Sequence, residues 1–263
     1  MNVASTEGLV SLVVASCNQK VRLENSLLSL RRQVGVSYEV VVVDAGSCDG
    51  SLDVLREWSR EDSGRFRVLE APHSITPTAA VNLGAEEAKG DILVFLHADF
   101  ILVPDFCLRT ARAYVSRPGR VLITGLWKPL SFVPSPDEAG NVLSWMDSGL
   151  GPTFSEERTF SRGCIRDPWW MSAAHALVSI KKEHWSGWDE DLPSVYPEWA
   201  WAYQLAQAGF EFYWCPLMLG FHQYHARRDP RRDEASRQVF IDATHTLEVK
   251  LGLPFDKIAR EVR

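Results

Sequence analysis

The chain has 263 residues, of which 46% are hydrophobic and 24% are charged. These fractions are typical of globular proteins, so the composition excludes disordered and fibrous classes, and the length suits one large domain or a domain with an appendage. Acidic residues outnumber basic residues by 34 to 28, and the resulting net charge of −6 argues against a nucleic-acid-binding protein, which usually carries a basic face.

Strands and helices alternate over the first hundred residues. Apolar, β-branched runs predict strands at Leu9–Ala15, Tyr38–Asp44, Phe66–Glu70 and Asp91–Asp99. Between them, helical spacing predicts a helix over Val21–Val34, a second helix capped by Ser51, and a third that begins at Thr76-Pro77 and ends with Gly90 as C′. This order predicts an α/β fold with a doubly wound, mostly parallel sheet.

The second half of the chain differs from the first. Residues Leu126–Arg166 contain many prolines and glycines without clear periodicity, and further elements are predicted as a strand at Ala173–Ile180, a helix at Glu198–Ala208, a strand at Glu211–Cys215 and a helical tail. Nine of the ten tryptophans lie after residue 104, which indicates that this part of the chain has a different function from the first. We therefore divide one domain, 1–263, into a half at 1–104, a half at 105–225 and a tail at 226–263.

Five scattered cysteines without C-x-x-C spacing predict reduced thiols rather than a disulfide framework or a zinc site. No stretch of about 20 apolar residues, the length needed to cross a bilayer, is present, and the N-terminus lacks the pattern of a signal peptide. We expect a cytoplasmic protein without transmembrane segments, able to contact a membrane peripherally. The sequence does not indicate the oligomeric state.

Polar residues follow three of the predicted strands, namely Ser16-Cys17-Asn18, Asp44-Ala45-Gly46-Ser47 and His97-Ala98-Asp99. Ligands of open α/β sheets bind beyond the carboxyl ends of the strands, so these groups are expected to share one crevice. The loop after the first strand lacks both G-x-G-x-x-G and the P-loop pattern, so a bound phosphate would need another source of positive charge.

A divalent metal is the predicted source of that charge. His97 and Asp99 lie two residues apart at a strand end, and the cluster from His222 to His225 could supply a further ligand. Imidazole ligands move the preference from Mg²⁺ toward Mn²⁺. In the second half, Glu198 is predicted at a helix N-terminus among tryptophans, where it could act either as a cap or as a catalytic base.

Taken together, these segments resemble a glycosyltransferase of the GT-A fold, most closely family 2. Val41–Ser51 resembles V-V-D-D-G-S-x-D-G-S, Ala80–Gly84 resembles A-R-N-x-G, Phe95–Asp99 resembles F-L-D-A-D, and Gly187–Glu190 is similar to G-F-D-E. The resemblance runs from about residue 9 to residue 225. It implies a nucleotide-sugar half at 1–104 and an acceptor-binding half at 105–225.

The resemblance also implies roles for individual residues. The donor, expected to be a uridine diphosphate sugar, would contact Ser16, Asn18, Asp44, Asn82, His97 and Asp99. A divalent cation, Mn²⁺ ahead of Mg²⁺, would be held by His97, Asp99 and His222. Glu198 would be the general base of an inverting hexosyl transfer and Asp189 a second catalytic acid, while Trp170, Trp188 and Trp199 would contact the acceptor. That acceptor could be a saccharide, a lipid-linked molecule or a small molecule.

Four positions depart from the family pattern, because Ala45, His97 and Pro197 replace acids and Val81 replaces an arginine. These departures leave open a non-catalytic, carbohydrate-binding relic of the fold. They also leave open reduced activity or a donor other than a uridine diphosphate sugar. A second alternative is an iron oxygenase, since His97, Asp99 and His222 formally match a two-histidine, one-carboxylate triad. The strand–helix alternation argues against that alternative, because such triads usually lie on all-β jelly rolls.

Overall fold

A computed structural model describes residues 8–130, 132–141, 177–192, 197–224 and 234–252. Within these ranges, eight strands form one sheet with the order β3-β2-β1-β4-β7-β6-β8-β5. The strands are β1 (Val10–Ser16), β2 (Tyr38–Ala45), β3 (Phe66–Ala71), β4 (Ile92–His97), β5 (Phe100–Leu102), β6 (Val121–Pro129), β7 (Val178–Lys181) and β8 (Glu211–His222). Neighbouring strands β3, β2, β1 and β4 are all parallel, whereas β7 and β5 run antiparallel to their partners. The mostly parallel sheet expected from the sequence is confirmed.

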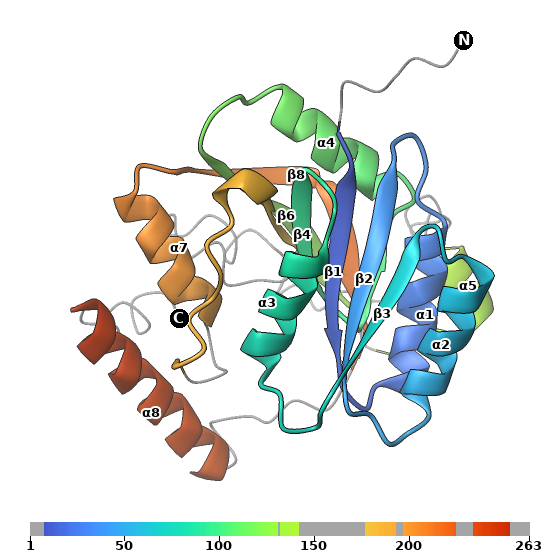
Figure 1. The fold of residues 1–263 in the computed structure, drawn as a ribbon, viewed down its shortest axis with the longest axis horizontal. Helices are drawn as coiled ribbons and strands as arrows, with labels where there is room; N and C mark the ends of the chain where they lie inside the picture. Colours follow the sequence, from blue (N-terminus) through green and yellow to red (C-terminus); the bar gives the residue numbers. More distant parts are fainter. Residues whose placement is uncertain (1–7, 131, 142–176, 193–196, 225–233, 253–263) are drawn as a thin grey trace.

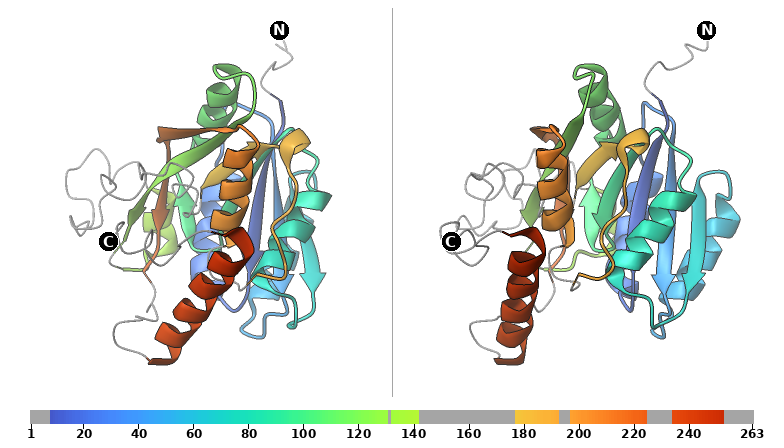
Figure 2. Two further views of the ribbon diagram at one scale, coloured as in Figure 1. Left: turned by 90° about the vertical axis from the view of Figure 1, so that its left-hand side faces the viewer. Right: turned by 60° about the vertical axis from the view of Figure 1, so that its left-hand side comes forward.

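Helices cover both faces of this sheet. They are α1 (Lys20–Arg31), α2 (Ser51–Glu61), α3 (Pro77–Glu87), α4 (Phe106–Val115), α5 (Pro136–Gly140), α7 (Pro197–Gln207) and α8 (Glu234–Leu251), with a 3₁₀ turn, η3, at Lys182–His184. Figures 1 and 2 show α7 and α8 at the end of the molecule away from α1 and α2.

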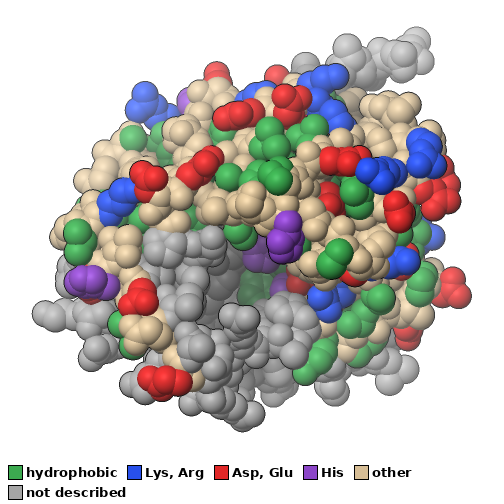
Figure 3. All heavy atoms as spheres, turned by 60° about the horizontal axis from the view of Figure 1, so that its bottom comes forward, with side chains coloured by type: hydrophobic (Ala, Val, Ile, Leu, Met, Phe, Trp, Pro, Cys, Tyr) green, Lys and Arg blue, Asp and Glu red, His purple; other side chains and the backbone are tan. Residues whose placement is uncertain are grey.

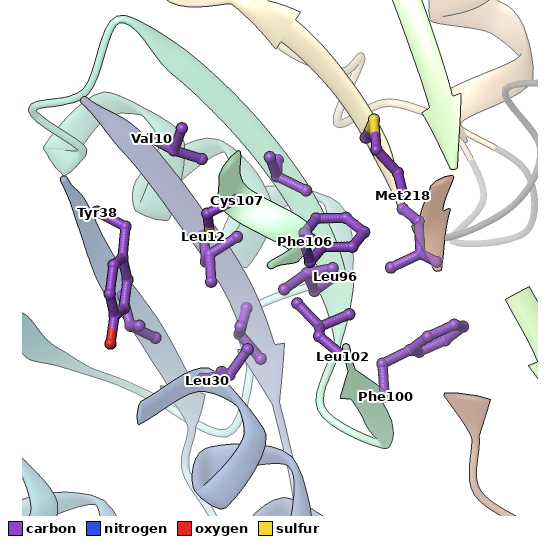
Figure 4. Packing of buried hydrophobic residues seen from close by; sticks show 14 of the residues in the cluster. Val10, Leu12, Leu30, Tyr38, Leu96, Phe100, Leu102, Phe106, Cys107 and Met218 are labelled. Carbon is purple, nitrogen blue, oxygen red and sulfur yellow. The ribbon is translucent and has the colours of Figure 1, made fainter. Parts of the chain in front are cut away.

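Two apolar cores lie on opposite faces of the sheet because the side chains of β1 alternate. Leu12 and Val14 of β1 belong to the core that includes residues of α1, α2, α4 and α5. Val13 points the other way, into the core that includes residues of α3, α7 and α8. Figure 4 shows part of the first core, in which β1 packs against Leu30 of α1 and Phe106 of α4. The all-apolar central strands are thus explained by burial on both faces.

The structure corrects three expected helix ends. Helix α1 ends at Arg31 rather than at Val34. Helix α2 begins after Gly50, whose φ is 88°, and Ser51 is its first residue rather than its cap. Helix α3 begins as expected, with Thr76 Oγ1 accepting a hydrogen bond from the Ala79 N–H, but it ends at Glu87. Gly90 is not a C′ residue, since its φ is not positive, and a Cβ there would lie 2.5 Å from Ser11 Oγ. Close approach to β1 therefore explains this glycine.

The strand expected at Asp91–Asp99 is interrupted. Strand β4 ends at His97, Ala98 and Asp99 form a turn, and β5 then pairs with the end of β8. Sequence reasoning also missed α4, β6 and α5. The part of the expected Ala173–Ile180 strand before Leu177 lies outside the described residues.

Strand β8 is longer than expected and contains a bulge. Its first part pairs with β6 up to Gly125 and Cys215, and pairing resumes at Leu126 and Leu219. The three intervening residues, Pro216–Met218, have no partner in the β6 register. A proline is tolerated in this strand because a bulged residue does not need to donate to the ladder.

A buried polar cluster joins the amino ends of the parallel strands. Ser11 Oγ donates to Glu39 Oε1 at 2.6 Å and accepts from the Gly90 N–H at 2.8 Å. Glu39 also receives hydrogen bonds from the Lys89 N–H and from Arg67. Burial acts to raise the pKa of Glu39, but these hydrogen bonds outweigh it and hold the pKa below its usual value. The carboxylate is therefore ionised and ties three segments together.

We expect Ser11→Ala to destabilise the protein by about 1–3 kcal/mol, because it leaves the Gly90 N–H and one Glu39 oxygen without a partner in a buried site. Chemical denaturation followed by circular dichroism measures the change. The exposed Ser63→Ala is the control, with an expected effect within about 0.5 kcal/mol. Equal midpoints for both variants would contradict the importance of the cluster.

Candidate functional site

The carboxyl ends of β1, β2 and β4 meet at one edge of the sheet. In the strand register, Ser16 lies opposite Asp44 and Ala15 lies opposite His97. The shared crevice expected from the three polar strand ends is therefore supported by the observed pairing. Strand β1 runs toward the bottom of Figure 1, and Figure 3 turns that side forward, where histidine side chains lie near a hollow in the surface.

Two buried oxygens at this edge lack a partner. Asp44 is 1% exposed; its Oδ1 accepts a hydrogen bond from the Ser47 N–H at 2.9 Å. Its Oδ2 and the hydroxyl of Ser16 have no hydrogen-bond partner among the described residues. Buried polar groups normally have partners, so this pair indicates a position where a ligand's hydroxyl or N–H groups would be bound.

Asn18 shapes the neighbouring loop. It adopts a φ of 52°, its Oδ1 accepts from the Cys48 N–H at 2.8 Å, and its own N–H donates to Ser47 Oγ at 2.9 Å. Across from it, Gly46 has a φ of 68°, and a Cβ there would lie 2.6 Å from the backbone nitrogen of His73. Asn18 and Gly46 thus fix the loops beside Asp44.

His97, Asp99 and His222 come together as a candidate metal site. Each offers a ligand atom, and these atoms all lie within 4.8 Å of one another. His222 Nε2 is 3.3 Å from Asp99 Oδ2, and both of these residues are buried while His97 is exposed. The rings of Phe100 and Trp127, at 5.0 and 5.6 Å, pack around the His222 imidazole.

The chemistry of this set fits a divalent transition metal. Two imidazoles and one carboxylate can bind Mn²⁺ or a later metal, whereas Mg²⁺ prefers an oxygen-only shell. The exposed position of His97 leaves one side of the set accessible to a ligand. The other histidine of the late cluster, His225, lies outside the described residues.

Asn82 contacts the segment that resembles G-F-D-E. Its Nδ2 donates to the Trp188 carbonyl and to Glu190 Oε1, both at 2.8 Å, and its Oδ1 accepts from the Trp188 N–H at 2.8 Å. Both amide protons are therefore already used. Asn82 joins α3 to residues 188–190, more than 100 positions away, and its expected contact with a donor stays a prediction.

Asp189 forms an ion pair with a lysine of α8. Lys250 Nζ lies 2.5 Å from Asp189 Oδ2, and this hydrogen bond lowers the pKa of Asp189, which is therefore ionised at neutral pH. Sequence reasoning missed both Lys250 and Glu190 as partners. Since Lys250 lies 61 positions from Asp189, periodicity carried no signal for this pair.

Glu198 lies in the first turn of α7. Burial raises its pKa to about 7, which brings the carboxyl group close to half ionisation at neutral pH. Such a group can accept a proton from a hydroxyl more readily than an ordinary glutamate can. In the described part of the chain, no hydrogen bond or ion pair joins Glu198 to the metal-ligand set or to Asp189.

The tryptophans of this region form an aromatic cluster. Trp188 lies 5.5 Å from Phe95 and 6.2 Å from Trp201 between ring centroids. Trp199, one of the three expected acceptor contacts, is only 5% exposed and packs in the core with α3 residues. Trp170 lies outside the described residues, so the structure leaves the acceptor contacts as predictions.

Comparisons with known proteins show the fold and a family resemblance. A family model described as glycosyl transferase family 2 matches residues 11–130. Among solved structures, TarS of S. aureus superimposes with a TM-score of 0.62 at 12% identity, over 96% of this chain and 42% of TarS. The mannosyltransferase PcManGT of Pyrobaculum calidifontis, solved with GDP-Man and Mn²⁺, gives 0.58 at 18% identity, over 99% of this chain and 75% of its own. The chain has the GT-A fold of glycosyltransferases.

The sequence relatives match the N-terminal part of this chain. EpsH of Bacillus subtilis (strain 168), named as a glycosyltransferase, is 36% identical over 105 residues, which cover 39% of this chain and 30% of EpsH. The undecaprenyl-phosphate 4-deoxy-4-formamido-L-arabinose transferase of Aeromonas hydrophila is 30% identical over 108 residues, 40% of this chain and 33% of the relative. The chain thus spans about a third of these relatives, and the resemblance to glycosyltransferase family 2 is confirmed over its N-terminal half.

We expect Asn82→Ala to lower the free energy of unfolding by about 2 kcal/mol, since three hydrogen bonds to residues 188–190 are lost. Urea denaturation measures this change. Glu57→Ala, at an exposed position of α2, is the control and is expected to shift stability by less than about 0.5 kcal/mol. If the two variants are equally stable, Asn82 does not fasten this segment to α3.

Proposed function

We propose that this protein is a metal-dependent glycosyltransferase that moves a sugar from a nucleotide diphosphate sugar to an acceptor hydroxyl. The observation that carries the proposal is the clustering of His97, Asp99 and His222 at the strand edge that also holds the unpartnered oxygens of Asp44 and Ser16. A cation bound by the first three residues would lie at the same end of the sheet as the two unpartnered oxygens, which could bind hydroxyl or N–H groups of the ligand. That is the arrangement a nucleoside diphosphate requires.

The ligands bound in the related structures support the choice of donor. TarS residues 1–349 have been solved with UDP-GlcNAc, and PcManGT with GDP-Man and Mn²⁺. For this chain we propose a uridine diphosphate sugar as the donor and a hexosyl group as the transferred group. The proposed cofactor is Mn²⁺ ahead of Mg²⁺. A guanosine diphosphate sugar is the second candidate, because the replacement of the family's arginine by Val81 leaves the donor contacts less constrained.

A division of labour follows from this donor. Asp44 would accept hydrogen bonds from the nucleoside and Ser16 would donate one to it. Asn18 would hold the loop beside them, and Asn82 and His97 would lie beside the sugar. A divalent cation held by His97, Asp99 and His222 would supply neutralisation of the negative charge that develops on the departing diphosphate. Residues 1–104 would form the donor half, 105–225 the acceptor half and 226–263 a helical tail.

Glu198 is proposed as the general base. Its carboxylate would take the proton from the acceptor hydroxyl while the oxygen of that hydroxyl forms the new bond to the anomeric carbon. The bond from that carbon to the diphosphate oxygen would break at the same time, and the nucleotide diphosphate would leave with the electron pair. A single displacement of this kind inverts the anomeric configuration. Asp189, ionised and anchored by Lys250, is proposed as the second acid of the site.

The acceptor is proposed to bind against the tryptophan-rich half, at Trp170 and Trp188, because flat aromatic rings stack on sugar faces and apolar groups. Trp199, the third expected contact, is buried in the core and offers little ring surface to an acceptor. Saccharide, lipid-linked and small-molecule acceptors all fit this description. None of the helices in the described ranges is long and apolar enough to cross a membrane. A cytoplasmic location, with or without peripheral membrane contact, stays a prediction.

Two features distinguish the proposed enzyme from its two alternatives, namely the fold and the transfer of sugar. The mostly parallel α/β sheet disfavours an iron oxygenase, since its triad is expected on a jelly roll. A non-catalytic relic would bind the donor without transferring sugar, so it differs from an enzyme only in turnover.

A nucleoside diphosphate is expected to stabilise the protein only when Mn²⁺ is present. Thermal unfolding is measured with UDP, GDP and their sugars, each with Mn²⁺ and with EDTA. A ligand at 100 times its Kd adds about 2.7 kcal/mol to the free energy of unfolding, which raises Tm by several degrees. Asp99→Asn removes the carboxylate charge from the ligand set and is expected to abolish the Mn²⁺-dependent shift. If no nucleotide shifts the wild-type Tm under any condition, the proposal fails.

Transfer by the wild type is expected to rise with pH up to about 7 and then level off, because the raised pKa keeps Glu198 protonated, and inactive as a base, below that pH. Glu198→Gln is expected to reduce kcat by roughly 10²- to 10⁴-fold and to flatten this limb. Release of UDP from a uridine diphosphate sugar with a panel of acceptors is the readout. The exposed Glu211→Gln serves as the control. A wild-type rate for Glu198→Gln would exclude Glu198 as the base.

A further inference from the structure

One buried glutamine connects the two strands that carry the candidate metal ligands. Gln223 directly follows His222 and is completely buried. Its backbone N–H donates to the carbonyl of Asp99 at 3.0 Å, next to the pairing of Phe100 with His222. This hydrogen bond therefore joins the backbone directly after His222 to the backbone of Asp99.

The side chain of Gln223 anchors this junction on α1. Its Oε1 accepts from Asn25 Nδ2 at 2.9 Å, and its Nε2 donates to the Arg22 carbonyl at 2.8 Å. Asn25 Nδ2 also donates to the carbonyl of Pro134 at 2.8 Å, which brings the segment before α5 into the same network. The amide of Gln223 thus has partners for its oxygen and for its nitrogen.

A second connection from α1 reaches the turn between His97 and Asp99. Ser26 Oγ donates to the Ala98 carbonyl at 2.8 Å, and Gln223 Nε2 lies 3.4 Å from the same hydroxyl. Two successive carbonyls of this turn, those of Ala98 and Asp99, are therefore held by one network. The first is held by α1 directly, and the second by the backbone of Gln223.

We propose that Gln223, with Ser26, is a positioning residue that sets the geometry of the His97, Asp99 and His222 ligand set. The inference rests on the proposed metal-dependent function of that set. Ligand atoms from two separate segments can bind one ion only if the segments keep a fixed distance and orientation. Here the His97–Asp99 turn and the end of β8 are both held by hydrogen bonds that involve α1 and Gln223. Partners that orient metal ligands in this way typically contribute 10- to 100-fold, by order of magnitude, to metal affinity.

A second buried glutamine makes a matched comparison possible. Gln33 is 5% exposed; its Nε2 donates to the carbonyls of Ser29 and Val103, and its Oε1 accepts from the Cys107 N–H. It has the same kind of amide network as Gln223 and is also tied to α1. Its partners, however, include no residue of the His97–Asp99 turn and no neighbour of His222.

The test compares Gln223→Met with Gln33→Met. Methionine keeps nearly the volume of glutamine and removes its hydrogen bonds, so both variants are expected to lose similar stability. Binding of Mn²⁺ alone is measured by electron paramagnetic resonance of the free ion, at a temperature where circular dichroism shows each variant folded. We expect the Kd for Mn²⁺ to rise by about 10- to 100-fold in Gln223→Met and by less than about threefold in Gln33→Met.

Ser26→Ala is the second variant, which keeps the test decisive if Gln223→Met does not fold. It removes the hydrogen bond to Ala98 and is expected to weaken Mn²⁺ binding severalfold. Equal Mn²⁺ affinities in the Gln223, Ser26 and Gln33 variants would overturn the positioning role and leave the proposed function intact. Failure of the wild type to bind Mn²⁺ would instead overturn the metal-dependent function and this role with it.

Discussion

The parallel pairing of β1 with both β2 and β4 is the constraint on which the site depends. Because all three strands run the same way, Ser16, Asp44 and His97 reach one edge of the sheet although they come from separate parts of the sequence. Burial on both faces holds this register, since a shift of one residue would exchange the side chains that face the two cores. The position of the polar groups is thus a consequence of apolar packing.

The N-terminal half could be predicted well because its signals are local. A strand is predicted by the apolar run at Tyr38–Asp44 and a helix start by the cap at Thr76, and both patterns involve only residues close together in the sequence. Strand β2 and the start of α3 were found where expected. Gly90 was misread for the opposite reason. Its requirement is close contact with Ser11, almost 80 positions distant, and no pattern around residue 90 records that contact.

The candidate site divides in the same way. The candidate metal ligands were recognisable by residue type and family resemblance, whereas the contacts that hold the residues of the site in place were not. The hydrogen bonds of Asn82 to residues 188–190 left no signal in the sequence, and neither did the pairing of Lys250 with Asp189. A trace of the network around Gln223 was visible, because Asn25 and Ser26 interrupt the apolar face of α1 beside Leu23 and Leu27. Without the partner across the sheet, that interruption could not be interpreted.

The bulge in β8 determines which residue of that strand occupies the site. Had the pairing of Gly125 with Cys215 continued without interruption, Leu219 would lie opposite Pro129, where His222 now lies. Three extra residues also reverse the alternation of side chains between the two faces of the sheet. The segment Pro216–Met218 therefore acts as a spacer of fixed length: inserting or deleting one residue there would carry the histidine away from Asp99, whereas a change of length in a surface turn such as that near Gly64 would leave both in place.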